Sequence, residues 1–277
     1  MAEAQRLVSS SPAIAVRRPV GIFDSGVGGL SVAREIRRAL PAEDVLYVAD
    51  TAYCPYGDRA LAEVRDRALA VGRYLADAGA KLIVVACNTA SGAALEDLRA
   101  VLPVPVVGLE PAVKTAVGQT RTGRIAVLAT SGTLRSDRFS RLLRAHGGAV
   151  EVVAQPCPGL ADLIEEGHLD DDVLSARLDA LTRPLKQAGV DMVVLGCTHY
   201  AFVSAALARA LGPAVTLVDS APAIARRTTH LLDESAAGRP VDGEGRFQVL
   251  TTGDPGRVGP VVERLWGAPV DVAAVRI

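Results

Sequence analysis

The sequence is poor in aromatic residues and has almost no net charge. Only 4% of its 277 residues are aromatic, whereas 49% are hydrophobic, so a core must be built mainly from Ala, Val, Leu and Ile. Such a composition suits a buried parallel sheet, in one large or two modest α/β domains. The formal net charge of -1, with acidic and basic side chains interspersed, argues against a groove for nucleic acid or a lipid-binding face.

Long apolar runs and export signals are missing as well. No run approaches the roughly 18–20 residues that a membrane-spanning helix needs. The stretch Met1–Pro19 mixes Ser, Arg and Pro with short apolar pieces, and it lacks the continuous apolar segment of a signal peptide. We therefore interpret residues 1–18 as a flexible N-terminal tail and expect a cytoplasmic protein without a membrane partner.

Cysteine is scarce and widely spaced. Cys54, Cys87, Cys157 and Cys197 are too few and too dispersed for a disulfide scaffold, and the absence of any C-x-x-C pair argues against a zinc site. In a reducing cytoplasm the four thiols are expected to stay free. The sequence thus predicts no metal site and no bound cofactor, and it leaves the thiols available for chemistry.

Short β-rich runs alternate with helical patterns along most of the chain. Helical patterns cover Ala60–Ala78 and Ser136–His146, with Gly79 and Gly147 as their stops. Strands separated by helix-length segments predict right-handed crossovers and parallel sheets. The predicted strands are Val20–Phe23, Val45–Ala49, Leu82–Ala86, Val104–Val107, Ile125–Ala129, Val150–Ala154, Met192–Leu195, Val215–Val218, Phe247–Leu250 and Val270–Ala273.

The chain also resembles itself. The segment Leu82–Ala90 matches Met192–Tyr200, since each has an apolar strand, a small residue, a cysteine and a polar turn. Earlier in each half, Gly21–Gly26 matches Val127–Gly132. The two pairs recur at offsets of 110 (197 minus 87) and 106 (131 minus 25) residues, which favours a duplication. The alternative is that all parallel α/β proteins look self-similar at this level.

Polar residues gather just past the predicted strand ends, where parallel sheets collect ligands. A duplicated fold that faces itself would bring the two repeated cysteines to opposite walls of one cleft. The residues in question are Asp24, Ser25, Cys87, Asn88, Thr130, Ser131, Cys197, Thr198 and His199.

Two matching thiols suit a reaction that must run equally well in both directions. Enantiomers have equal free energy, so a racemase needs a base on one face of the α-carbon and an acid on the other, with exchangeable roles. A quasi-symmetric pair, Cys87 and Cys197, meets this requirement, whereas a lone nucleophilic cysteine does not. Cys54 and Cys157, each beside a proline, are interpreted as structural.

Each repeated cysteine enters a helix N-terminus, where the dipole favours a thiolate. Asn88 or Thr89 is expected to cap one helix and Thr198 the other. The dipole contributes roughly 0.3–1 kcal/mol, less than the 1.4 kcal/mol of one pKa unit, and burial opposes it. Further groups must help, and Asp24 and His199 are the nearest candidates by position in the motifs.

In six ordered motifs the chain resembles bacterial glutamate racemase, within the aspartate/glutamate racemase family. The resemblance runs from about Pro19 to the C-terminus. Two departures are visible: Ala201-Phe202 stand where the family commonly has Pro-Leu, and Gln155 and Pro156 precede Cys157 where single-residue variants are more usual. The motifs that carry the resemblance are Gly21–Leu30, Pro55–Gly57, Ala86–Ser91, Gly108–Lys114, Gln155–Gly159 and Gly196–Tyr200.

The resemblance implies two pseudo-symmetric parallel-sheet α/β domains with the active site in the cleft between them. The first domain would comprise residues 19–113 and 220–277, and the second residues 114–219. The implied activity is interconversion of L- and D-glutamate without pyridoxal phosphate or metal, which supplies D-glutamate to peptidoglycan.

By the same resemblance, Cys87 and Cys197 are the acid/base residues, and Cys87 acts on the D-enantiomer. Asp24 and His199 would assist the cysteines, with Asp50 and Glu165 as weaker supporting candidates. The implied substrate-binding residues are Asp24, Ser25, Tyr56, Gly57, Asn88, Thr89, Thr198 and His199.

Three other functions remain open at this level. An aspartate racemase of the same fold would also need two thiols, and cleft depth would separate the two substrates. A decarboxylase of this fold would use one cysteine, which is not the pattern here. A catalytically silent homologue would bind an acidic amino acid or a protein partner. The expected partner is the small molecule glutamate, and a homodimer is compatible with the sequence.

Overall fold

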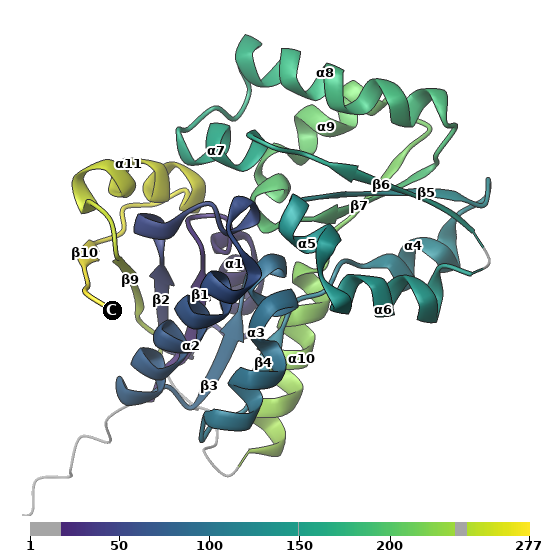
Figure 1. Cartoon of the computed structure of the whole chain (residues 1–277). Coiled ribbons are helices and arrows are strands. Elements are labelled where there is room, and N and C mark those ends of the chain that lie inside the picture. The colour runs from purple at the N-terminus through teal and green to yellow at the C-terminus, as the bar shows by residue number, and fades with distance from the viewer. Residues whose placement is uncertain (1–17, 149, 236–242) are drawn as a thin grey trace, which may run out of the picture.

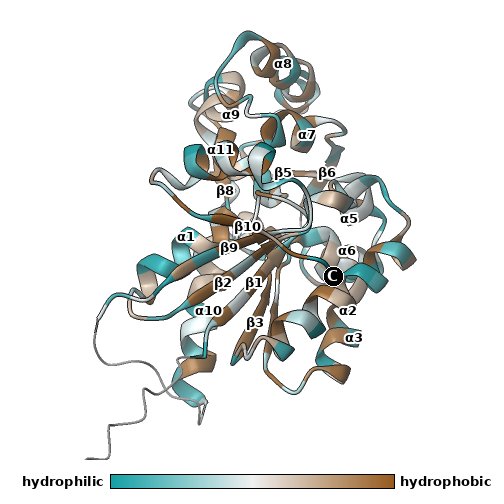
Figure 2. Cartoon of the chain, turned by 90° about the vertical axis from the view of Figure 1, so that its left-hand side faces the viewer, coloured by the Kyte–Doolittle hydropathy of each residue, from teal (hydrophilic) through white to brown (hydrophobic). Residues whose placement is uncertain are grey.

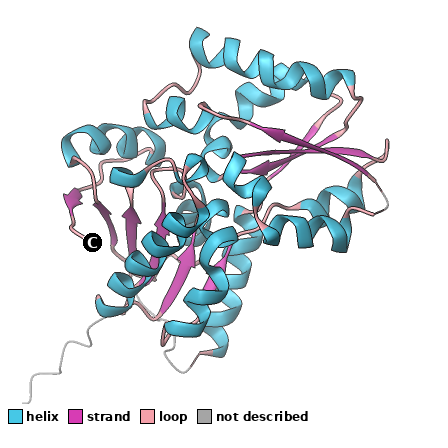
Figure 3. Cartoon of the chain, in the orientation of Figure 1, coloured by secondary structure: helices cyan, strands magenta, loops and turns pink. Residues whose placement is uncertain are grey.

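Two parallel β-sheets form the framework of the protein (Figures 1 and 3). The computed structural model describes residues 18–148, 150–235 and 243–277. The first sheet has the order β10-β9-β2-β1-β3-β4 and the second the order β6-β5-β7-β8. The strands are β1 (Val20–Asp24), β2 (Val45–Ala49), β3 (Leu82–Val85), β4 (Val106–Gly108), β5 (Arg124–Ala129), β6 (Glu151–Pro156), β7 (Met192–Gly196), β8 (Thr216–Val218), β9 (Phe247–Thr251) and β10 (Val272–Ala274).

Helices cover both faces of each sheet (Figure 3). The α-helices are α1 (Leu30–Ala39), α2 (Leu61–Asp77), α3 (Asn88–Val101), α4 (Val113–Gln119), α5 (Ser131–Arg135), α6 (Asp137–His146), α7 (Leu160–Glu165), α8 (Asp172–Gln187), α9 (Ser204–Leu211), α10 (Ala221–Glu234) and α11 (Pro255–Trp266). Among the described residues, short 3-10 helices lie in loops that follow strands: η1 (Thr51–Tyr53), η2 (Tyr56–Asp58) and η3 (Thr198–Val203).

The buried strand runs are apolar throughout because their side chains point alternately to two faces of the sheet, both of which are covered by helices. In β1, Ile22 packs with α1, α10 and α11 on one face, whereas Phe23 packs with α2 and α3 on the other. In β7, Val193 packs with α7, α8 and α9, whereas Val194 packs with α4 and α6. Successive side chains point to opposite faces of a strand, so a sheet covered on both faces needs apolar residues at every position. Figure 2 shows the resulting apolar centre of the first sheet.

The same topology occurs twice, as the repeated segments predict. Strands β2-β1-β3-β4 in the first sheet have the same order as β6-β5-β7-β8 in the second, and all pairs are parallel. Val20 of β1 pairs with Leu82 of β3, and Ile125 of β5 pairs with Met192 of β7. The two cysteine-bearing strands therefore occupy equivalent places beside their central strands.

The chain crosses between the sheets twice. We call the first sheet with α1–α3, α10 and α11 the first lobe, and the second sheet with α4–α9 the second lobe. After β8 the chain returns to the first lobe, where α10 packs against α1 and β9 pairs with β2 (Figure 1). The domain limits at residues 113/114 and 219/220 themselves stay predictions.

Most expected elements are present, with shifts at prolines. The expected strands Val104–Val107 and Val270–Ala273 begin two residues later, at Val106 and Val272, next to Pro105 and shortly after Pro269. Proline has no N–H to donate to a ladder, so strands start after it. Gly79, with φ of 86°, and Gly147 follow the ends of α2 and α6 as expected.

The expected N-terminal tail lies outside the described residues except for Arg18. The Arg18 guanidinium donates to the carbonyl of Gly79 (3.3 Å). In the described part of the chain, no helix is long and apolar enough to cross a bilayer.

Candidate active site

Cys87 stands between β3 and α3, in the first lobe. Its backbone is extended (φ -143°, ψ 122°), and the helix starts at the next residue. Its own Sγ accepts the backbone N–H of Ala90 (3.5 Å), so the N-cap is Cys87. The expectation that Asn88 or Thr89 caps this helix is therefore wrong, because both residues already lie inside it.

Cys197 stands at the equivalent place between β7 and η3. The chain behind it forms a 3-10 turn from Thr198 to Val203 before the α-helix begins, so the expected regular helix start is wrong here. Thr198 is not a cap either. Its Oγ1 donates to Asp24 Oδ2 (3.1 Å), and its carbonyl accepts the Ser31 hydroxyl (3.1 Å). Thr198 thus binds the first lobe instead of capping the helix that follows Cys197.

Asp24 is the buried end of β1, and its carboxylate organises the loop that follows. Oδ1 accepts the Ser25 N–H (2.7 Å), and Oδ2 accepts the Gly29 N–H (2.6 Å). Burial raises the pKa of Asp24, against the opposing effects of the His199 charge and of a hydrogen bond with Cys87. Asp24 therefore lies against the first thiol, as its motif position indicated.

Burial is the main influence on the pKa of the Cys87 thiol. Cys87 is 6% exposed, and burial, followed by the Asp24 charge, raises its pKa well above the usual value. A smaller effect in the same direction comes from Cys197. The two thiols are thus near enough for the charge on one to affect the other, although they belong to different lobes.

His199 connects the second thiol to a carboxylate. Its Nδ1 lies 3.6 Å from Cys197 Sγ, and its Nε2 lies 2.6 Å from Glu165 Oε1. Burial acts to lower the pKa of His199, but hydrogen bonds with Cys197, Cys54 and Glu165 raise it well above the usual value. The expected contact between Cys197 and His199 is present, and a carboxylate orients the imidazole in turn.

Glu165, the last residue of α7, reaches across to the first lobe. Its Oε1 accepts the Val27 N–H (2.7 Å) and lies 3.5 Å from Cys54 Sγ. A Cβ at Gly26 would lie 1.8 Å from this oxygen, and a Cβ at Gly28 would lie 2.3 Å from His199 Nδ1. Gly26 and Gly28 are therefore required by the close approach of the second lobe.

Asp50, a weaker supporting candidate, is held by Arg67, Tyr56 and Thr252. Arg67 binds both of its oxygens, at 2.7 and 3.0 Å, and the Tyr56 hydroxyl donates to Oδ2 (2.5 Å). Thr252 donates to Oδ1 (2.8 Å). These contacts give Asp50 a role in holding Tyr56, which is 1% exposed.

Three threonines join the lobes on the side of Cys87. Thr89 Oγ1 lies 2.8 Å from Thr130 Oγ1 and 3.1 Å from Thr133 Oγ1. Gly57 packs against Thr130, since a Cβ there would lie 2.6 Å from the threonine Cβ. Among the described residues, no group pairs with the buried Oδ1 of Asn88. An orphaned buried acceptor of this kind suits a donor group of a ligand.

Of the other two cysteines, one lies unexpectedly at the site. The sequence predicts a structural role for Cys54, yet its thiol contacts Glu165 from the loop after η1. Cys157 is buried behind Tyr200, whose hydroxyl donates to the Cys157 carbonyl (3.4 Å). Burial raises the pKa of each thiol to about 12, so both stay protonated at neutral pH.

A pocket of about 650 Å³ opens beside this cluster, between the lobes. Cys87 and Cys197, at 6% and 8% exposure, are buried and are not part of the lining of this pocket. The lobes are thus closed on the two thiols. The pocket is lined by Val27, Thr51, Ala52, Cys54, Asp162, Glu165, Glu166, Gly253, Asp254, Arg257, Val258 and Val261.

Comparison with known proteins matches most of the chain. A family model described as Asp/Glu/Hydantoin racemase matches residues 20–228. The chain is 46% identical over 250 residues to the glutamate racemase of Roseiflexus sp. (strain RS-1), covering 90% of this chain and 92% of that protein.

Two solved structures have the same architecture. Glutamate racemase from Thermus thermophilus, in complex with Beta-chloro-D-alanine, has a TM-score of 0.80 and 40% identity, covering 94% of this chain and 97% of that one. Escherichia coli glutamate racemase, in complex with L-glutamate and the activator UDP-MurNAc-ala, has a TM-score of 0.82 and 34% identity, covering 93% and 97%.

Proposed function

Because the chain belongs to the Asp/Glu/Hydantoin racemase family, we propose that it interconverts L- and D-glutamate by proton transfer at the α-carbon. It is an isomerase, and its D-glutamate supplies peptidoglycan. Its substrate is a small molecule, in line with the ligands of the solved relatives. Independence from pyridoxal phosphate and metal is part of the proposal.

The observation that carries the proposal is the equivalent placement of two thiols on opposing lobes. Cys87 follows β3 and Cys197 follows β7, and these strands pair with β1 and β5 in the same way. Each thiol has its own ionisable partner, Asp24 on one side and His199 on the other. Such an arrangement supports a reaction in which acid and base exchange roles with direction.

With L-glutamate bound, Cys197 acts as the base. His199 accepts the proton of the Cys197 thiol, and the resulting imidazolium, held by Glu165, stabilises the thiolate. The thiolate takes the α-proton, and the Cys87 thiol gives its proton to the opposite face of the carbanion. Cys87 ends as a thiolate and Cys197 as a thiol, so the next turnover starts from D-glutamate or after proton exchange.

With D-glutamate bound, the roles reverse. Asp24 lies against Cys87 and, because burial raises its pKa, its carboxylate is a better proton acceptor than an ordinary one. It accepts the Cys87 proton, and the thiolate removes the α-proton while Cys197 donates from the other side. The two equivalent thiols thus have different proton acceptors, Asp24 for Cys87 and His199 for Cys197.

The substrate's charged groups are held by the helix starts. The free N–H groups at the N-terminus of α3 and the Thr89 hydroxyl suit the α-carboxylate, whose developing charge they stabilise. The Thr198 hydroxyl joins them when the lobes separate and its hydrogen bond to Asp24 opens. The buried Asn88 Oδ1 suits an N–H of the ammonium group. Ser25, Tyr56 and Gly57 complete the proposed binding set. Since the lobes are closed on the thiols, substrate entry requires them to separate.

Association into a homodimer and a cytoplasmic location also belong to the proposal. Light scattering of the purified chain tests the first, and localisation of the tagged chain in cells tests the second. No interaction with nucleic acid is proposed.

Solvent exchange at the α-carbon tests the proposed reaction. Purified protein is incubated with L- or D-glutamate in heavy water, without pyridoxal phosphate and with a chelator. Proton NMR and polarimetry should show racemisation with one solvent deuterium in the product, while the unreacted enantiomer keeps its α-proton at early times. Exchange without inversion, or no exchange, would overturn the two-thiol reaction. Faster exchange with aspartate would instead identify an aspartate racemase.

A further inference from the structure

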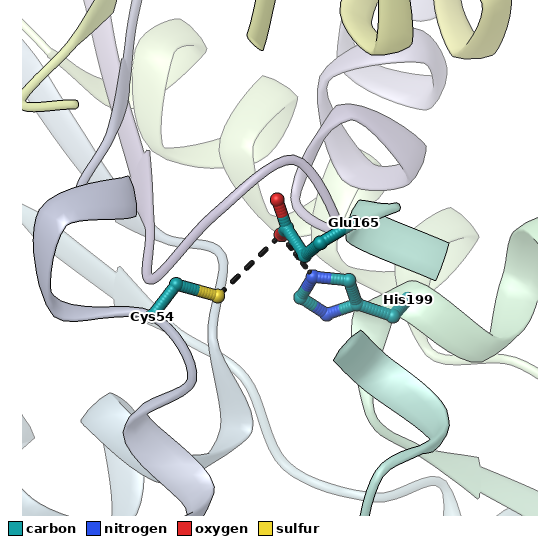
Figure 4. Close-up of side chains that lie close together, drawn as sticks. All are labelled: Cys54, Glu165 and His199. Carbon is teal, nitrogen blue, oxygen red and sulfur yellow. Dashed lines mark hydrogen bonds and ion pairs between the residues drawn. The ribbon is translucent and has the colours of Figure 1, made fainter. Parts of the chain in front are cut away.

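Three side chains that bind soft divalent cations converge between the lobes: Cys54, Glu165 and His199 (Figure 4). One ligand atom from each, a thiol sulfur, a carboxylate oxygen and an imidazole nitrogen, lies within 4.8 Å of the other two. Figure 4 shows the three side chains pointing toward a common centre from three separate segments. The proposed reaction uses Glu165 and His199 but leaves Cys54 without a task.

The cluster is held in place before any ion arrives. His199 is 2% exposed, and its Nδ1 is engaged by Cys197, which leaves Nε2 facing the cluster. Glu165 Oε1 is fixed by the Val27 N–H at 2.7 Å. For His199, whose other ring nitrogen is engaged by Cys197, this contact orients the nitrogen that faces the cluster at little entropic cost.

The spacing of the ligand atoms fits a tetrahedral zinc ion. With Zn–S near 2.3 Å and Zn–N and Zn–O near 2.0–2.2 Å, ligand atoms on one ion lie roughly 3.3–3.6 Å apart. Cys54 Sγ and Glu165 Oε1 already lie 3.5 Å apart. His199 Nε2 and Glu165 Oε1, now 2.6 Å apart in a hydrogen bond, need to separate by about 0.7–1.0 Å.

The pocket beside the cluster gives a cation access to the ligand atoms, and its negative charge attracts the cation. Cys54 and Glu165 are part of its lining, so two of the three ligands are reached directly. Its lining carries the carboxylates of Asp162, Glu165, Glu166 and Asp254 against a single guanidinium, Arg257. This excess of negative charge concentrates cations and repels an anionic amino acid.

We propose that Cys54, Glu165 and His199 form a binding site for one Zn²⁺ ion that ties the two lobes together. On binding, the Cys54 thiol loses its proton, and the proton between His199 and Glu165 also leaves to solvent. The ion takes one sulfur, one oxygen and one nitrogen ligand, and water fills the fourth position. A thiolate, a carboxylate and an imidazole are the ligand types that zinc prefers.

The consequence for activity rests on the proposed function. With the ion on Nε2, the neutral imidazole of His199 carries its proton on Nδ1, so it cannot accept the proton of Cys197. Because Cys54 belongs to the first lobe and the other two ligands to the second, the ion also holds closed the lobes that substrate entry must separate. Both effects make zinc an inhibitor of this enzyme.

Cobalt spectroscopy tests the site without any reference to activity. The full-length, reduced, metal-free protein is titrated with Co²⁺, which reports a thiolate ligand through a sulfur-to-cobalt absorption band. The expected result is one Co²⁺ per chain, displaced by Zn²⁺. Cys54→Ala should abolish the band and weaken zinc binding by more than about 100-fold, since loss of a ligand costs more than loss of an outer-shell contact. Cys157→Ala, at a buried cysteine away from the cluster, should keep the band.

Racemase assays in the presence of zinc give the second measurement. Cys54→Ser, checked for native circular dichroism, should still racemise glutamate without metal, because its hydroxyl can donate to Glu165 in place of the thiol. It should need more than about 100-fold more Zn²⁺ for half inhibition. If the wild-type protein binds no Co²⁺, the site is refuted. It is also refuted if the Cys54 variants keep the absorption band or the zinc sensitivity, because the ion would then be bound by Cys87 or Cys197. A protein that shows the Cys54-dependent band but no racemisation would instead refute the proposed function.

Discussion

Thr198 of the second lobe donates its hydroxyl to the carboxylate of Asp24 in the first, with Oγ1 and Oδ2 3.1 Å apart. On the other side of the site, Thr89 of the first lobe bonds to Thr130 of the second at 2.8 Å. Threonines one or two positions after each thiol in the sequence thus bind the opposite lobe. The separation of the two sulfurs therefore depends on how the lobes close, and substitutions at these contacts act on both thiols together.

Replacement of either thiol by a hydroxyl should nearly stop racemisation. A serine hydroxyl is far less acidic than a thiol, so it neither forms the base nor gives its proton readily. We expect Cys87→Ser and Cys197→Ser each to lower kcat/KM by about 10²–10⁴-fold, measured by polarimetry. Cys157→Ser is the matched control and should stay active. Equal damage from Cys54→Ser or Cys157→Ser would show that the thiols are wrongly assigned.

Asp24 and His199, the proposed proton acceptors of the two thiols, should affect the isotope effects of the two reaction directions differently. Since the enantiomers have equal free energy, kcat/KM must be the same from either side, so the difference appears in isotope effects. His199→Gln should lower kcat/KM by about 10²-fold and give a larger isotope effect with α-deuterated L-glutamate, whose proton goes to Cys197. Asp24→Asn should give the larger effect with the D-form. Identical effects in both variants would contradict separate proton acceptors.

A methyl group at Gly28 should displace the catalytic imidazole. A Cβ there would lie 2.3 Å from His199 Nδ1, the atom that faces Cys197. We expect Gly28→Ala to lower kcat/KM by about 10²-fold and the free energy of unfolding by about 1–3 kcal/mol. Gly118→Ala in α4 is the control, because its Cβ meets nothing within 4 Å and the helix gains up to about 1 kcal/mol. Full activity of Gly28→Ala would mean that the position of His199 is unimportant.

The sequence predicts the framework well because buried parallel strands leave a strong local signal. Runs such as Met192–Gly196 are apolar at every position, and polar residues follow where the strand ends. Asp24, Cys87 and His199 could therefore be placed at strand ends without knowledge of the fold. The repeat in the sequence also corresponds to the repeated strand order.

Contacts that depend on docking of the lobes leave no such signal. Cys54 and Glu165 are separated by 111 residues, so no motif spacing joins them. The sequence also does not predict the 3-10 start of η3, where the Thr198 carbonyl and hydroxyl bind the first lobe. Propensity within one segment does not report hydrogen bonds to a distant segment, and here these contacts decided the local conformation.

Loss of the buried carboxylate at the start of β7 should destabilise the second lobe. Asp191 is 6% exposed, and it accepts hydrogen bonds from the Thr120 hydroxyl (2.5 Å) and the Arg121 N–H (2.6 Å). We expect Asp191→Asn to lower the free energy of unfolding at pH 7 by about 2 kcal/mol, because an amide oxygen accepts these bonds more weakly and its NH₂ group cannot accept at all. Urea denaturation measures the change. Asp66→Asn, at an exposed side chain of α2, is the control and should change stability by less than about 0.5 kcal/mol.

The same substitution has a defined pH dependence. Burial acts to raise the pKa of Asp191, but hydrogen bonds from the loop 120–122 lower it to about 2. A carboxyl with a lower pKa in the folded state stabilises the fold above its unfolded pKa of about 3.9, and this contribution is lost as the pH falls toward 2. The difference between wild type and Asp191→Asn should therefore be constant from pH 7 to 5 and shrink below pH 4. A difference that stayed constant down to pH 3 would mean that the charge of Asp191 does not stabilise the loop.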